Sequence, residues 1–479
     1  MVFNSIEFAI FLPAAFLLYW FVFSRSCKLQ NIFILAASYL FYGWWDWRFL
    51  SLIAFTSLCS WASGLHIERR RNEGGNARAI SVANIVVNLA ILCLFKYHDF
   101  FAESFARCFL GGRSEGLLLH LILPVGISFY TFQALSYSID VYRGKIAATR
   151  DIVQFFAYVS FFPQLVAGPI ERASNLLPQF AKPRRLDAGE AIDGVTLALW
   201  GLFKKMVLAD NCAIYVDAIF SSPQGQSGST LLLAAILFAL QIYGDFSGYS
   251  DIAIGTARLF GIKLSRNFNV PYFSRDIAEF WRRWHISLTT WFRDYVYIPL
   301  GGSRCSKAKV IRNTFVIFLL SGLWHGANWT FLAWGAYHAL LFLPLIVTGR
   351  NRRNTGPVAE GRALPSAAEF GKMLLTFQLV TIGWIFFRAD SVQQACSYIA
   401  GIFDSSLFSA PAISNAADMV PIPIAIIAVA IVEWTCRNNA NGACFTPKSN
   451  AARIIFCTLT VLLTIFFGAS SDSFIYFQF

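Results

Sequence analysis

The sequence predicts an all-α polytopic membrane protein, and composition and patterning carry that prediction. The chain has 479 residues, 56% of them hydrophobic and only 14% charged, with a mean hydropathy of +0.54. A water-soluble protein of this length needs more charge to cover its surface. Apolar runs long enough to cross a bilayer recur along the chain, without the alternation typical of membrane-spanning strands. Backbone groups in hydrocarbon must be hydrogen-bonded within the chain, so we expect helices.

The first apolar run, Phe8–Phe23, follows an acidic residue and no basic one. A cleaved signal peptide begins with a basic region, so we expect a retained helix. Further crossings are expected, in chain order, at residues 32–42, 50–65, 80–95, 117–132, 372–387, 422–434 and 454–467.

Basic clusters separate these runs, for example at Arg69–Arg78 and Arg350–Arg362. Cytoplasmic loops of membrane proteins carry this excess of Lys and Arg. The net charge of +12 therefore indicates no nucleic-acid partner. With the basic loops inside, both termini face outside and the number of full crossings is even. The ten cysteines show no metal-ligand spacing, so we expect neither a disulfide framework nor a zinc site.

Two stretches do not fit a simple crossing. Residues 161–180 carry Pro163, Gly168 and Pro169 inside an apolar segment. Broken backbone at membrane depth is tolerated only where protein or a water-filled cavity covers it, which predicts a re-entrant element or a tunnel lining. Residues 314–347 are too long for one ordinary crossing at about 1.5 Å per residue. We expect either a tight helical hairpin or one long bent helix there.

Residues 274–304 are expected to form an interfacial amphipathic segment. Apolar side chains recur there at three- and four-residue spacing, with arginines as their polar counterpart. Ser274 is the expected N-cap. Such a helix lies in the membrane interface and does not cross the membrane, with His285 at the border of its apolar face.

The stretch SGLWHGANWT, residues 321–330, places a titratable ring deep inside residues 314–347. Burying an imidazole without partners is costly, so His325 is either a hydrogen-bonded structural residue or a functional one. Trp324 accompanies it, and Asn328 shares a helix face with it if the helix continues. The remaining histidines are expected to be interfacial or packing residues: His66, His98, His120 and His338.

Asp245 and Asp251 lie in YGDFSGYSD, at the end of a long apolar run. They form either part of a cation pathway or the polar end of a membrane-spanning segment, and the second interpretation is favoured. No Gly-rich phosphate loop and no Gly-x-Ser-x-Gly elbow occurs. A buried imidazole stays neutral and accepts a proton, which suits a general base that activates a hydroxyl for attack on a thioester or ester carbonyl. A transporter or polysaccharide export component would use the same features as a pathway, although no internal repeat is evident.

The chain resembles the membrane-bound O-acyltransferase (MBOAT) family, and within it the bacterial alginate O-acetylase branch. The motifs that carry this resemblance are spread over most of the chain: MVFNSIEFAIFLPAAFLLYW, LPVGISFYTFQALSYSIDVYRG, FPQLVAGPI, YGDFSGYSDIAIG, FNVPYFSRDIAEFWRRWHISLTTWFRDYVYIPLGGSR, LWHGANWTFLAWGAYH, GWIFFRA and FIYFQF.

The resemblance implies one MBOAT-type membrane domain over residues 1–479, with a ring of transmembrane and re-entrant helices around a central tunnel. His325 falls on the family's buried catalytic histidine, and His285 falls on a second functional position. Candidate tunnel or substrate-binding residues are Trp324, Asn328, Asp245 and Ser287. The closing FIYFQF resembles the C-terminal motif of small partner proteins in teichoic-acid D-alanylation, which makes Tyr476 a candidate acyl relay, with an aromatic membrane anchor as the alternative.

The function implied is O-acetylation of a cell-surface polysaccharide, such as alginate or another exopolysaccharide, from the bacterial inner (cytoplasmic) membrane. Acetyl-CoA is the expected donor substrate, entering from the cytoplasm, with no bound cofactor and no metal. The expected partners are the lipid bilayer, extracytoplasmic acetyltransferase proteins and the polysaccharide acceptor. Peptidoglycan O-acetylation and teichoic-acid D-alanylation are the alternatives within the enzyme class.

Overall fold

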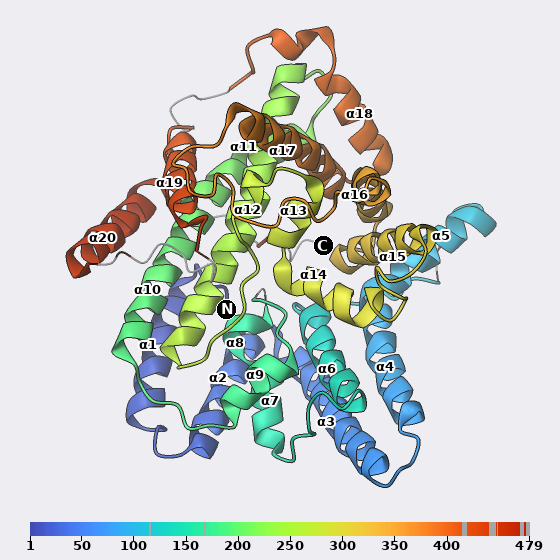
Figure 1. The fold of residues 1–479 in the computed structure, drawn as a ribbon, viewed down its shortest axis with the longest axis vertical. Coiled ribbons are helices and arrows are strands. Elements are labelled where there is room, and N and C mark those ends of the chain that lie inside the picture. The colour runs from blue at the N-terminus through green and yellow to red at the C-terminus, as the bar shows by residue number, and fades with distance from the viewer. Residues whose placement is uncertain are drawn as a thin grey trace. The chain divides into compact units, whose positions relative to one another are not determined.

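The computed structural model describes residues 1–114, 116–166, 168–413, 419–439, 447, 449–469 and 474–475. All regular elements in this part of the chain are helices, as the composition predicts (Figure 1). Six segments are long and apolar enough to cross a membrane: Cys27–Asn72, Arg78–Phe109, Gly228–Leu259, Trp329–Val347, Ala367–Arg388 and Asn450–Phe467. The all-α polytopic class is therefore confirmed.

The chain divides into two compact units. Unit 1 comprises residues 1–198 and 252–265, and unit 2 comprises residues 199–251 and 266–479. The single domain expected over residues 1–479 stays a prediction.

Unit 1 is built from the N-terminal helices and the first part of α10. Its elements are α1 (Ile6–Phe21), α2 (Cys27–Asp46), η1 (Trp47–Phe49), α3 (Leu50–Asn72), α4 (Arg78–Leu92), η2 (Cys93–Tyr97), α5 (His98–Phe109), α6 (Ile127–Tyr142), α7 (Ile152–Ser160), α8 (Phe162–Leu165), α9 (Ala173–Phe180) and α10 (Ala188–Phe203).

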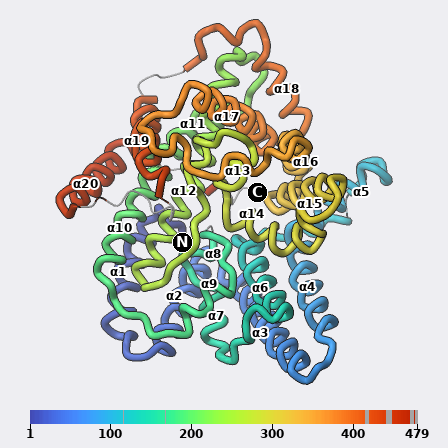
Figure 2. The backbone as a smooth tube through the Cα atoms, viewed as in Figure 1, coloured from blue at the N-terminus to red at the C-terminus, as the bar shows by residue number. Residues whose placement is uncertain are grey.

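Helices α3, α4 and α6 lie side by side in unit 1 (Figure 2). Small and amide side chains allow this packing, as is usual between helices in membranes. A Cβ at Gly64 would lie 2.5 Å from the Tyr137 ring, so the helices approach closely only with glycine there. Asn84 Nδ2 donates to Ser138 Oγ at 2.8 Å, which joins α4 to α6 through buried polar groups.

In unit 1, one expected membrane crossing is wrong, and one expected interruption of helical backbone is present. The crossing predicted at residues 117–132 is wrong, because α6 begins only at Ile127. The left-handed backbone of Gly126 (φ 75°) precedes it, and a Cβ there would lie 2.6 Å from the Leu165 carbonyl oxygen. Within residues 161–180, the described residues 166 and 168–172 between the short helices α8 and α9 are non-helical, as the prolines predict.

Unit 2 contains the end of α10, α12 as far as Asp251, and the C-terminal helices. Its elements are η3 (Lys204–Ala209), α11 (Asp210–Ser221), α12 (Gly228–Leu259), η4 (Pro271–Phe273), α13 (Ile277–Arg283), α14 (Ile286–Phe292), η5 (Arg293–Tyr297), α15 (Lys307–His325), α16 (Trp329–Val347), α17 (Ala367–Arg388), α18 (Val392–Ile402), η6 (Ser405–Phe408), α19 (Pro421–Cys436) and α20 (Asn450–Phe467).

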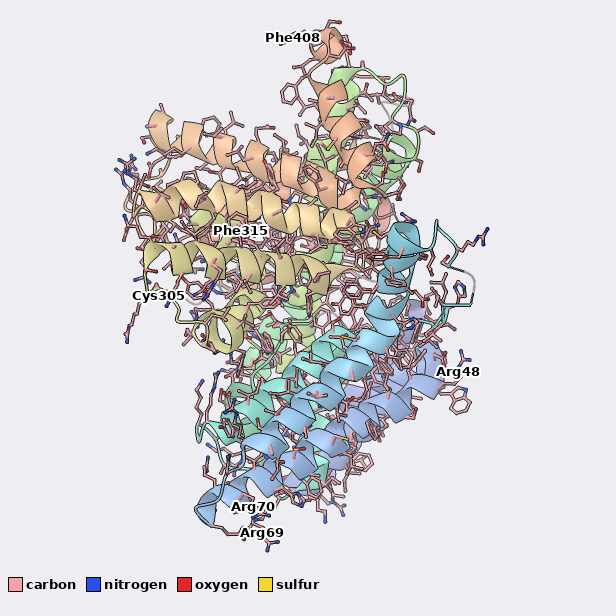
Figure 3. The ribbon with its side chains drawn as sticks, turned by 90° about the vertical axis from the view of Figure 1, so that its right-hand side faces the viewer. Arg48, Arg69, Arg70, Cys305, Phe315 and Phe408 are labelled. Atoms are coloured by element: carbon pink, nitrogen blue, oxygen red, sulfur yellow. The ribbon has the colours of Figure 1, made fainter. Side chains whose placement is uncertain are left out.

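Residues 314–347 form a helical hairpin of α15 and α16, which decides between the two expected forms. Helices α15, α16 and α17 lie side by side (Figure 3). A Cβ at Gly322 would lie 2.2 Å from the Phe331 carbonyl oxygen, and one at Gly335 would lie 2.4 Å from that of Phe318. The two helices therefore pack backbone to backbone.

The single amphipathic helix expected over residues 274–304 is wrong. The chain forms two short helices, α13 and α14, with extended Trp284 and left-handed His285 (φ 42°) between them. The N-cap is Asp276 and not Ser274, because the Asp276 side chain accepts from Glu279 N. Trp284 and His285 are each 1% exposed, so this break is buried within unit 2.

Candidate active site

His325 is the last residue of α15, in a tight turn that leads into α16. Asn328 is the N-cap of α16, and its side chain accepts from Thr330 N at 3.1 Å. A Cβ at Gly326 would lie 2.0 Å from the Phe331 ring, so the turn holds only glycine at this position. The turn thus fixes a histidine at a buried helix end, where its side chain is 4% exposed.

Aromatic rings surround the His325 imidazole. Its centroid lies 5.0 Å from that of Trp324, 5.3 Å from Trp334 and 5.2 Å from Phe387, with all three rings close to perpendicular to it. Trp334 belongs to α16 and Phe387 to α17, so three neighbouring helices shape the surroundings. Edge-to-face packing of this kind fixes ring orientation and excludes water.

His285 brings a second imidazole to the same place. Its centroid lies 6.2 Å from that of His325, 5.6 Å from Trp324 and 4.7 Å from Phe246 of α12. The left-handed backbone turns the chain here, and Ile286 N donates to the Asn267 carbonyl oxygen at 2.8 Å. The two histidines singled out from the sequence are therefore neighbours, and Trp324 contacts both.

Two other predicted residues are placed by structural hydrogen bonds. Ser287 Oγ donates to Asn267 Oδ1 at 2.5 Å, next to the backbone bond of Ile286, so this serine stabilises the turn at His285. Asn328 Nδ2 donates to the Asp390 carbonyl oxygen at 3.3 Å, while its own oxygen caps α16. Asn328 does not share a helix face with His325, because α15 ends between them.

Asp245 lies near the middle of α12 and not at its end. Its Oδ1 is 2.7 Å from Lys205 Nζ, and Lys205 Nζ is also 2.8 Å from Asp210 Oδ1, with each of these side chains 2–3% exposed. Asp251 pairs with Lys204 at 2.7 Å. Sequence reasoning missed both lysines, although two adjacent lysines in the apolar stretch GLFKKMVLA were a visible signal of buried ion pairs.

Tyr476 lies outside the described residues, but the two residues before it are described. Phe474 and Ile475 are 1% and 3% exposed. The Phe474 ring centroid lies 4.1 Å from that of Tyr249 and 6.2 Å from that of Phe246. Because Phe246 also contacts His285, this part of the C-terminus packs next to the histidines. Within the described ranges, no group of three or more His, Cys, Asp or Glu side chains is arranged to hold a metal ion.

Comparison with known proteins identifies the family. A model of the membrane-bound O-acyltransferase family matches residues 39–365. The probable alginate O-acetylase AlgI of Pseudomonas aeruginosa is 40% identical, over 84% of this chain and 75% of the relative. The probable alginate O-acetylase AlgI of Pseudomonas putida is 36% identical, over 95% of this chain and 91% of the relative. The peptidoglycan O-acetyltransferase of Helicobacter pylori is 33% identical, over 82% and 77%.

The chain belongs to the membrane-bound O-acyltransferase family. It is therefore a multi-pass membrane enzyme that uses an acyl donor, and the choice between enzyme and transporter is decided in favour of the enzyme.

Proposed function

We propose that this chain is an inner-membrane O-acetyltransferase that moves acetyl groups from cytoplasmic acetyl-CoA for O-acetylation of a cell-surface polysaccharide, alginate or a similar exopolysaccharide. The names of the relatives support an acetyl donor and a glycan acceptor. Separate extracytoplasmic acetyltransferases complete the reaction. The observation that carries the proposal is the pair of buried imidazoles, His285 and His325, with ring centroids 6.2 Å apart inside aromatic walls.

His325 acts as the general base in this proposal. It takes the proton of the acceptor hydroxyl as the oxygen attacks the thioester carbonyl. The carbon–sulfur bond breaks, the acyl–oxygen bond forms, and the proton passes to the departing thiolate, which restores neutral His325. Trp324, Trp334 and Phe387 keep water away from the thioester, so that acetyl reaches the acceptor and is not hydrolysed.

His285 orients the donor thioester or lines its path, since it shares the Trp324 ring with His325. Ser287 and Asn328 act indirectly, because their hydrogen bonds hold the two turns that carry the histidines. Tyr476 is the proposed relay that receives the acetyl group before the final acceptor. Tyr476→Phe removes the accepting hydroxyl, so continued acetylation by that variant would end the relay proposal.

The test uses membranes that contain only this protein, supplied with acetyl-CoA carrying a labelled acetyl group. We compare wild type with His325→Ala, and use His338→Ala as the matched control. His338 is also buried and also packs against Trp334, with centroids 5.1 Å apart, so its removal costs similar packing. We expect His325→Ala to lower the transfer rate by about 10²–10⁴-fold. His338→Ala should retain most of it.

The identity of the labelled species then names the next acceptor. Label on added alginate, on peptidoglycan or on a partner protein separates the polysaccharide alternatives. A D-alanyl donor assayed in parallel separates acetylation from D-alanylation. Equal losses in both histidine variants would contradict the base role, and no transfer by wild type from acetyl-CoA would contradict the donor.

A further inference from the structure

The C-terminal segment, which we define as the described residues 468, 469, 474 and 475, is hydrogen-bonded within unit 2 in both of its parts. At its start, Ala469 N donates to the Met206 carbonyl oxygen of η3 at 3.0 Å. Asn211 Nδ2 donates to the carbonyl oxygen of Phe467, the residue before the segment, at 2.9 Å. At its end, Ile475 N donates to Asp245 Oδ2 at 2.7 Å.

Asp245 is oriented to receive that N–H. Lys205 Nζ holds its other oxygen at 2.7 Å and is itself held by Asp210 at 2.8 Å. Because all three side chains are almost completely buried, water cannot compete for these contacts. Hydrogen bonds to a carboxylate are also stronger than those to a neutral oxygen. The lysine therefore fixes the carboxylate, and the carboxylate fixes the backbone at residue 475.

Ring contacts connect this anchor with the histidines. The Phe474 ring lies 4.1 Å from Tyr249, which is one helical turn beyond Asp245 on α12. Phe474 also lies 6.2 Å from Phe246, and Phe246 lies 4.7 Å from His285. Phe474 thus packs behind the Phe246 ring, which packs against His285, and a shift of residue 474 is transmitted through closely packed side chains.

We propose that Asp245 and Lys205 are positioning residues that dock the C-terminal segment behind His285, and that acyl transfer requires this docked state. The proposal rests on the proposed function for its activity readout, and on peptide binding for a readout that is independent of activity. Its partner is the chain's own C-terminus, recognised by a buried carboxylate at one backbone N–H and by Tyr249 and Phe246 at one aromatic ring.

The experiment uses the chain ended at Ala469 and a synthetic peptide of residues 470–479. We expect the truncation, which also removes Tyr476, to lower the acetyl-transfer rate by about tenfold or more, and the peptide to restore it. Because loss of the relay alone predicts the same result, the changes at Asp245 and Ile475 carry the test of docking. In the Asp245→Ala background the peptide should bind about tenfold more weakly, measured by fluorescence anisotropy of a labelled peptide. It should also fail to restore transfer at concentrations that suffice for the unchanged truncated chain.

Two altered peptides isolate the hydrogen bond without changing the membrane protein. Ile475→Pro removes the donating N–H, whereas Ile475→Ala keeps it and removes most of the side chain. We expect the proline peptide to bind weakly and rescue poorly, and the alanine peptide to rescue better. This pair carries the test even if Asp245→Ala fails to assemble.

Three results would overturn the proposal: undiminished transfer by the truncated chain, equal peptide affinity with and without the Asp245 carboxylate, or equal rescue by the proline and alanine peptides. Absence of transfer by the full-length wild type is a different result, because it contradicts the proposed function while peptide binding still reports on docking.

Discussion

Arg184 in unit 1 and the two histidines in unit 2 are buried polar side chains in very different surroundings. Arg184 Nε donates to Tyr19 Oη at 2.6 Å and its Nη2 donates to Asn31 Oδ1 at 2.7 Å, so its guanidinium joins the loop before α10 to α1 and α2. The described neighbours of His285 and His325 are mainly aromatic rings. The described contacts of Arg184 are hydrogen bonds, and those of the two histidines are ring contacts. Burial alone does not distinguish a structural polar residue from a candidate catalytic one, but the chemical nature of its neighbours does.

The largest effect that tests this comparison is expected from Arg184→Met. The substitution keeps an apolar stem but leaves the Tyr19 hydroxyl and the Asn31 amide oxygen without the guanidinium. Each buried group left unsatisfied costs about 1–3 kcal/mol, so we expect a loss of about 3 kcal/mol in stability. Thermal unfolding in detergent measures it, and the acetyl-transfer rate per folded molecule should stay near wild type. A lower rate per folded molecule would remove the distinction between the two regions.

Gly322→Ala should give the next largest effect, and it should change both quantities. The added Cβ would lie 2.2 Å from the Phe331 carbonyl oxygen, so α15 and α16 must separate. We expect about 2 kcal/mol of destabilisation and a lower transfer rate, because His325 ends α15. Gly371→Ala is the matched control. No atom lies within 4 Å of its Cβ, and alanine favours the helix, so stability should rise by about 0.5–1 kcal/mol.

The smallest effect is expected from His285→Asn. Asparagine tolerates the left-handed backbone found at this residue, so the turn between α13 and α14 should persist. The imidazole is lost, and we expect about a tenfold lower transfer rate, with an unfolding temperature close to wild type. The informative contrast is His285→Val, whose branched side chain is strained in that conformation and should lower stability as well. A fully active His285→Asn protein would reduce His285 to a packing residue.

Hydropathy was enough to predict the helical class and several of the segments that are long and apolar enough to cross a membrane, because burial in a membrane imposes a simple pattern on each helix. Gly228–Leu259 was not among the expected crossings. Periodicity was not enough at residues 274–304. The break at His285 depends on Asn267, which lies outside that segment and holds Ile286 and Ser287. The turn after His325 was better marked, since Asn328 before an apolar run is a recognisable N-cap signal. Residues 117–126 were assigned to a crossing by composition alone, yet no helix includes them.

The candidate site could be predicted only in part. The sequence singled out His285 and His325, and the fold brings their rings together. It did not indicate Trp334, Phe246 or Phe387, because aromatic residues are abundant in this chain and only tertiary packing selects three of them. Lys205 was missed for a related reason: its carboxylate partners are five and forty residues away along the chain, and spacing does not reveal that they meet.

The backbone-to-backbone contact between α15 and α16 limits which sequence changes this enzyme can accept. Positions 322 and 335 have no room for a side chain, so His325 moves with both helices as one rigid piece. Small substitutions at these two positions therefore cannot adjust the placement of the His325 ring. A family member with a different acceptor must therefore differ elsewhere, at residues outside the contact between α15 and α16.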